Sequence, residues 1–302
     1  MDVATGAAPQ DFVNSFLEFT KEYESPSSFW KWSAYATIAA VLRNNIYFTH
    51  GLGKIYPNIY VILLADSAEY RKDAGLKLSK ELLVEVQNTK IITGRASWQG
   101  ILDDLSQDIG NKKTGLLFKG GSCLIIAPEL ASFFVSDPQL IPMITDGYDY
   151  AEEFPYKLRS GSITVKNRCI NLLSASNETF LREVYNEQAV YGGLLRRTFM
   201  IKPDETRSPN SLVYPTMTQN EIDKMLAVKY DRKPLMDNLK RISKLHEELK
   251  TNNIRLTRGA AKFYDDWYKK LYPMYKTHPD RTGVLQSIHT SALKLAIIIA
   301  AS

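Results

Sequence analysis

Short apolar runs alternate with longer amphipathic segments over the first two thirds of the chain. Residues 59–64, 123–127 and 170–175 are continuous apolar runs rich in β-branched residues, which is typical of strands covered on both faces. We also expect strands at residues 90–93 and 198–202. Amphipathic spacing and capping residues predict helices at residues 73–86, 97–109, 129–135 and 178–185. Buried strands separated by helices predict an α/β protein with a mostly parallel sheet.

The pattern divides the chain into three parts. Residues 1–45 form an N-terminal helical segment, residues 46–203 the α/β core, and residues 216–302 a C-terminal helical lid or domain, which we expect to continue beyond Ser302. Proline-rich residues 204–215 link the last two parts. In the C-terminal part, Phe263, Trp267 and Leu271 recur at every fourth position, which usually indicates packing in a core.

The loop after residues 59–64 lies where a phosphate loop would lie, between a strand and a helix N-terminus. Aligning Lys72 with the lysine of G-x-x-x-x-G-K-[ST] places Asp66 and Arg71 at the glycine positions and Asp73 at the hydroxyl position. The candidate phosphate contacts are Asp66, Ser67, Arg71, Lys72 and Asp73. Each carboxylate near a phosphate is unfavourable by about 1 kcal/mol at 4 Å even in water. A structural turn whose acids cap the helix is the alternative.

Several short motifs along the chain together resemble a known family. They are the strand at residues 59–64 preceded by Tyr56-Pro57-Asn58, the pair Arg71-Lys72, the strand ending in Glu129, the pair Tyr148-Asp149, and Gly192-Gly193 followed by Arg196-Arg197. In this combination, residues 25–302 resemble helicase-like P-loop ATPases of phages, plasmids and integrated elements, some of them fused to primase-polymerases. The resemblance implies a RecA/AAA-like P-loop NTPase core that binds ATP and Mg²⁺, acts on DNA, and assembles as a homo-oligomer such as a hexameric ring, alongside a primase or another replication protein.

The same resemblance assigns roles to four residues outside the loop. Glu129 would act as the general base, Asn177 as a polar sensor of the γ-phosphate, and Arg196 or Arg197 as an arginine finger for a neighbouring subunit. Each has a structural alternative. Glu129 follows Pro128 as a helix N-terminal acid, Asn177 is a suitable N-cap, and the arginines are suited to ion pairs. Ala127 and Pro128 stand where a magnesium-binding Asp usually precedes the base.

A second candidate site comes from alternation alone. A turn at Ser160-Gly161 would pair Lys157 with Thr164 and Pro155 with Lys166. The hairpin would then carry an apolar face and a basic face suited to a phosphate backbone, made of Lys157, Arg159, Lys166 and Arg168. An ordinary half-exposed hairpin is the alternative.

Composition excludes some classes of protein and locates the charge. Of the net charge of +5, an excess of five lies between Lys229 and Arg258, with nine Lys or Arg against four Asp or Glu. This stretch could follow an anionic polymer or be a solvated helix face. The two cysteines lie in apolar runs, and the four histidines lack the spacing of metal ligands. Without a signal-like N-terminus or a long apolar run, we expect a cytoplasmic protein without a membrane span.

Two hypotheses for the function follow. The first is a DNA-dependent ATPase of viral or mobile-element replication, and the second is a catalytically inactive pseudo-ATPase that serves as an oligomeric scaffold or loader. The retained Lys72 and Glu129 favour the first, and the degenerate loop favours the second. A metabolic enzyme ranks last, since the sequence has no dinucleotide fingerprint and no Ser-His-Asp order.

Overall fold

Five parallel strands form the centre of the molecule. The computed structural model describes residues 11–66, 70–86, 89–94, 96–107, 109–110, 117–118, 121–135, 137, 139–158, 161–184, 192–205, 216–277, 280 and 282–302. The strand order is β10-β3-β9-β7-β4, and every neighbouring pair along this path is parallel. The strands are β10 (Thr198–Ile201), β3 (Tyr60–Leu64), β9 (Gly161–Ser176), β7 (Ser122–Ala127) and β4 (Lys90–Thr93).

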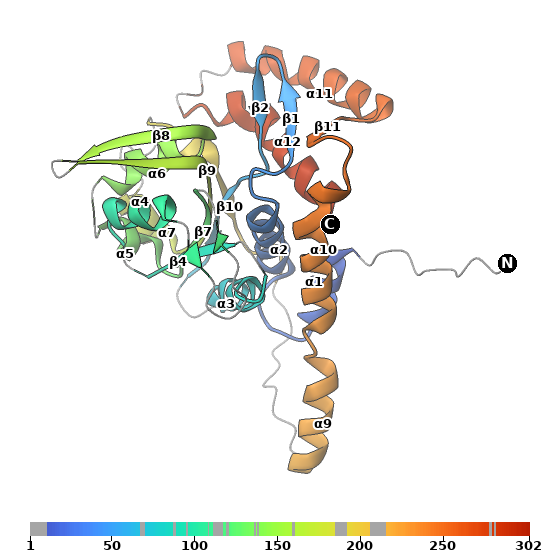
Figure 1. Ribbon diagram of the computed structural model, residues 1–302. Helices are drawn as coiled ribbons and strands as arrows, with labels where there is room; N and C mark the ends of the chain where they lie inside the picture. Colours follow the sequence, from blue (N-terminus) through green and yellow to red (C-terminus); the bar gives the residue numbers. More distant parts are fainter. Residues whose placement is uncertain are drawn as a thin grey trace.

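Continuous apolar runs occupy the middle of this sheet. All residues of β3 and β7 are buried, because helices cover both faces of a parallel sheet. β9 is longer and has two parts. Its first half pairs antiparallel with β8 (Ala151–Leu158) and projects as a hairpin, and its second half is buried between β3 and β7 (Figure 1).

Two hydrophobic clusters lie on opposite faces of the sheet, so the protein has three layers (Figure 1). The cluster on the first face joins α1 (Phe12–Phe19), α2 (Ser27–Leu42), α3 (Asp73–Leu83), α10 (Lys233–Glu248) and α12 (Val284–Ala301). The cluster on the second face joins α4 (Trp98–Ser106), α5 (Leu130–Val135), α6 (Leu140–Gly147) and α7 (Glu178–Val184). Helices from the N-terminal and C-terminal segments therefore share one core with the sheet.

Smaller elements surround these layers. A three-stranded sheet has the order β11-β1-β2, formed by β1 (Tyr47–His50), β2 (Gly53–Ile55) and β11 (Asn253–Ile254). The others are β5 (Ile109–Gly110), β6 (Leu117–Phe118), the 3₁₀ helix η1 (Leu195–Arg197), α9 (Gln219–Lys229) and α11 (Arg258–Thr277). The short sheet lies beside α11 and α12, and α9 extends α10 away from the core (Figure 1).

The parallel sheet and most of its helices match the sequence prediction. α6 was not predicted, and the aromatic stripe of α11 is not in a core: Phe263 is 75% exposed, and Leu271 is the buried member of that helix. α12 has the length and hydropathy to cross a membrane, as core helices of soluble proteins also can. Here one side of α12 packs into the first cluster through Leu293, Ile297 and Ile298.

Candidate functional site at the carboxyl edge of the sheet

The carboxyl ends of β3 and β9 meet at the centre of one sheet edge. The connection that leaves β3 passes through α3 on the first face, and the connection that leaves β9 begins with α7, which packs on the second face through Leu181. Adjacent strands whose connections lie on opposite faces mark the place where open α/β sheets are expected to bind ligands, and we call this part of the carboxyl edge the crevice. The loop with the candidate lysine starts from this crevice.

The ammonium group of Lys72 bridges the two strand ends. Its Nζ donates to the carbonyl oxygens of Ala65 and Asp66, the latter at 3.4 Å, and to the carbonyl oxygen of Ser176 at 3.1 Å. Partial burial lowers the pKa of Lys72, while Glu129, Asp66 and Asp73 act in the opposite direction. The structure therefore brings Lys72 close to three of the predicted acidic site residues, including Glu129, which is exposed directly after β7.

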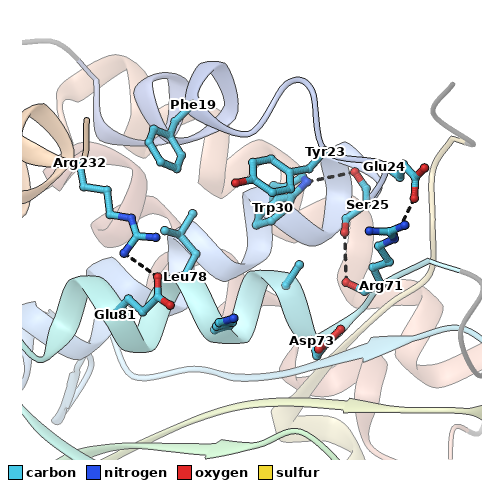
Figure 2. Close-up of a pocket in the computed structure, with 12 residues that line it drawn as sticks. Phe19, Tyr23, Glu24, Ser25, Trp30, Arg71, Asp73, Leu78, Glu81 and Arg232 are labelled. Atoms are coloured by element: carbon cyan, nitrogen blue, oxygen red, sulfur yellow. Dashed lines mark hydrogen bonds and ion pairs between the residues drawn. The ribbon is translucent and has the colours of Figure 1, made fainter. Parts of the chain in front are cut away.

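Arg71 is turned away from this crevice. Its backbone is left-handed, with φ of 43°, and its Nε lies 2.8 Å from Glu24 in the connection between α1 and α2. Ser25 Oγ donates to the carbonyl oxygen of Arg71 at 3.1 Å (Figure 2). Asp73 is the first residue of α3, and Ser67 lies outside the described residues. Arg71 thus holds the turn against the segment before α2, whereas among the described residues no side chain caps the N-terminus of α3, so the alternative of a turn capped by acids is not seen in this form.

A pocket of about 320 Å³ lies beside the turn, along α3 (Figure 2). One wall is aromatic, formed by Phe19, Tyr23 and Trp30. Ion pairs stand at its ends, Arg71 with Glu24 and Arg232 Nη1 with Glu81 at 2.7 Å. The lining comes from three segments that are separate in the sequence, so no local pattern indicates this pocket.

Asn177 follows β9 at the same edge and caps α7. Its Oδ1 accepts a hydrogen bond from the backbone N–H of Phe180 at 2.8 Å, and its carbonyl oxygen accepts one from Leu181 N at 2.9 Å. The capping role is therefore present. The cap uses the side-chain oxygen of Asn177. The role of Asn177 as a sensor of the γ-phosphate stays a prediction.

Arg196 and Arg197 lie at the opposite, amino edge of the sheet, because they directly precede β10, whose first residue pairs with Tyr60 at the start of β3. Arg197 Nη2 forms an ion pair with Asp149 at 2.8 Å, and Nη1 donates to the carbonyl oxygen of Gly193 at 3.2 Å. Within one chain the two arginines and Lys72 therefore lie at opposite edges of the sheet.

A buried lysine that the sequence did not reveal lies near these arginines. Lys294 of α12 donates through Nζ to Asn58 at the start of β3, at 3.0 Å to the carbonyl oxygen and 2.6 Å to Oδ1. The ammonium lies 4.0 Å from the ring centroid of Tyr148. Burial lowers the pKa of Lys294 to about 7. These hydrogen bonds hold α12 against the segment that directly precedes β3.

The hairpin of β8 and β9 differs from its prediction in register and in one key residue. Lys157 pairs with Ser162, Pro155 with Thr164 and Glu153 with Lys166. The register is shifted by two residues, which preserves the faces because side chains alternate with a period of two. Lys157 and Lys166 are exposed on one face, but Glu153 lies directly opposite Lys166; Arg159 lies outside the described residues.

Arg168 does not belong to the exposed basic face. Asn167 has a φ of 54°, which interrupts the strand alternation, and the Arg168 side chain is 4% exposed. Its guanidinium donates to Asp146 Oδ2 at 2.8 Å and lies over the ring of Phe154 at 4.0 Å. The expected position of Arg168 on an exposed basic face is therefore wrong, since the side chain is buried and paired with Asp146; its contact with nucleic acid stays a prediction.

Among the described residues, no three or more His, Cys, Asp or Glu side chains are grouped so that they could hold a metal ion. No protein-family model matches the chain, and no curated protein matches it. The fold stands as an α/β protein with a mostly parallel five-stranded sheet flanked by helices.

Proposed function

We propose that this chain is a nucleotide-binding, helicase-like ATPase of viral or mobile-element DNA replication, with its phosphate site at the carboxyl edge between β3 and β9. The observation that carries the proposal is the position of Lys72. Its ammonium lies at the crevice between the two strand ends, bonded only to backbone carbonyl oxygens in the hydrogen bonds described, and close enough to Glu129 for the carboxylate to affect its pKa. A phosphate group could replace those carbonyls as the acceptor.

The proposed chemistry uses this chain's own residues. Lys72 would exchange its carbonyl partners for phosphate oxygens, and the first backbone N–H groups of α3 would face the same anion. Glu129 would accept the proton of the attacking water, and Asn177 would orient that water. Arg196 would act on the nucleotide of a neighbouring subunit, which requires a closed ring of copies.

A catalytically inactive scaffold is the second candidate. The ion pair of Arg71 with Glu24 and the acidic side chains Asp66 and Asp73 favour it, because a loop held by ion pairs and flanked by carboxylates opposes phosphate binding. In this case the protein would keep the fold and the oligomer as a loader for nucleic acid or a replication partner, without turnover.

Nucleotide binding and hydrolysis by the full chain test both candidates. We would measure ATP-analogue affinity by calorimetry and phosphate release with and without single-stranded DNA, for the wild type, Lys72→Ala and Glu129→Gln. Lys80→Ala is the matched control, since Lys80 is an exposed lysine on the same helix. Loss of a charge-assisted hydrogen bond of about 1.5–3 kcal/mol predicts roughly 10- to 150-fold weaker binding by Lys72→Ala.

The outcomes separate the candidates. DNA-stimulated turnover that both active-site variants abolish supports the ATPase. Binding that Lys72→Ala weakens, without turnover in any variant, supports the scaffold. Wild-type protein that binds no nucleotide, or that binds it no better than Lys72→Ala, would overturn the ATPase, and turnover by the wild type would overturn the scaffold. Sedimentation velocity tests the ring separately.

A further inference from the structure

An apolar groove of about 470 Å³ runs between α11 and α12, far along the chain from the carboxyl-edge crevice and from the hairpin of β8 and β9. Small residues form part of its lining, namely Gly259 and Ala260 on the α11 side and Ala292 and Ala296 on the α12 side. Phe263 and Trp267 of α11 form the aromatic part of its wall. Phe263 is 75% exposed, so its ring is accessible to a ligand in the groove.

The spacing of the two rings suits flat ligands. Phe263 and Trp267 are four residues apart on one helix, so their side chains start about 6 Å apart along its axis. Bases along one strand of nucleic acid are about 3.4 Å apart, so about twice that distance admits one base between two rings. Base stacking on aromatic side chains is the common element of sites that bind single strands without sequence preference.

The charge around the groove is complementary to a phosphate backbone. Between Asn253 and Thr277, six Lys or Arg stand against two Asp. Asp265 is paired with Lys269, and the other acid, Asp266, is exposed four residues after Lys262 and four before Lys270. Lys262 directly precedes Phe263, Lys270 follows it by two helical turns on the same stripe, and both lysines are exposed. No acidic residue occurs in α12.

We propose that the α11–α12 groove binds single-stranded nucleic acid, with bases stacked on Phe263 and Trp267 and the backbone phosphates near Lys262 and Lys270. A purely apolar partner helix would use the groove but not its basic rim, and the rim together with the exposed ring favours nucleic acid. The site does not depend on nucleotide binding at Lys72.

Fluorescence anisotropy of a 5′-fluorescein-labelled 20-mer of deoxythymidine, titrated with the full chain, tests this proposal. Stacking on one ring corresponds to about 5- to 150-fold in affinity, so Phe263→Ala is expected to weaken binding by that factor. Phe263→Trp keeps a ring and should bind like the wild type. Lys262→Gln combined with Lys270→Gln should lower the slope of log affinity against log salt by roughly 0.7 for each phosphate that the variant no longer neutralises.

Tyr272→Ala is the matched control. Tyr272 lies on the same helix, is 47% exposed and points to the side opposite Phe263, so its removal should leave affinity unchanged. Circular dichroism and thermal unfolding establish that each variant is folded. The proposal is overturned if the wild type does not bind the 20-mer, or if Phe263→Ala and the double lysine variant bind it as the wild type does. Self-association of the wild type that Phe263→Ala abolishes, without an effect on the 20-mer, would also overturn it and make the groove an interface between copies.

Discussion

Replacing Lys294 by Met tests how the C-terminal helix is held on the sheet. Methionine fills a similar volume but removes the donor that reaches both oxygens of Asn58. A buried acceptor left without a partner destabilises a protein by about 1–3 kcal/mol. Two such acceptors predict that Lys294→Met lowers the free energy of unfolding by roughly 2–6 kcal/mol at alkaline pH, where the amine is neutral and still donates.

The effect of this substitution should depend on pH with a definite sign. Burial lowers the pKa of Lys294 to about 7 in the folded protein, whereas an unfolded chain has a lysine pKa of about 10.4. Below pH 7 both states are protonated and the fold carries the full penalty of a buried ammonium. Between pH 7 and 10 the unfolded state binds more protons, so stability rises with pH, by at most about 1.4 kcal/mol per unit. The variant lacks this contribution.

Urea unfolding followed by tryptophan fluorescence at pH 6.5, 7.5, 8.5 and 9.5 measures the difference between wild type and Lys294→Met. The difference should grow by about 1 kcal/mol per pH unit above pH 7, while an exposed lysine replaced in the same way, Lys80→Met, should give no slope. Parallel curves for the wild type and Lys294→Met would refute the reasoning, and so would a variant that is more stable than the wild type at pH 9.5.

Three further substitutions test packing and buried polar contacts, each by urea unfolding. Gly75→Ala should destabilise the protein by about 1–3 kcal/mol because its Cβ would lie 2.3 Å from Ser33 Oγ, even though alanine favours helices. Adding Ser33→Ala should recover part of this loss. If it does not, the contact with Ser33 is not the cause of the destabilisation. Arg168→Met should destabilise the protein by roughly 2–3 kcal/mol because it removes the hydrogen bonds to Asp146. Its affinity for nucleic acid should be that of the wild type. A decrease in affinity without a loss of stability would support the predicted contact of Arg168 with nucleic acid. Lys90→Met removes a donor to the last carbonyl oxygens of α4 and should lower the free energy of unfolding by about 1–2 kcal/mol. An unchanged midpoint of urea unfolding would contradict this prediction.

The sequence by itself determined the secondary structure of the core and the position of Lys72. Runs such as residues 59–64 are apolar without alternation, and only strands covered on both faces require that pattern. The helix after the loop starts at Asp73 as predicted, because amphipathic spacing is a local signal. For the same reason the sequence alone predicts the parallel sheet.

Only the tertiary structure decided which of the candidate residues are available for chemistry. A left-handed Asn167 turned Arg168 inward, an ion pair with Glu24 turned Arg71 away from the crevice, and the strand direction placed Arg197 at the far edge. Phe263 and Trp267 of α11, which the sequence places in a core, line an open groove instead. Local periodicity fixes which side chains share a face, but the partner that each face meets depends on contacts between segments distant in sequence, and no local pattern encodes those.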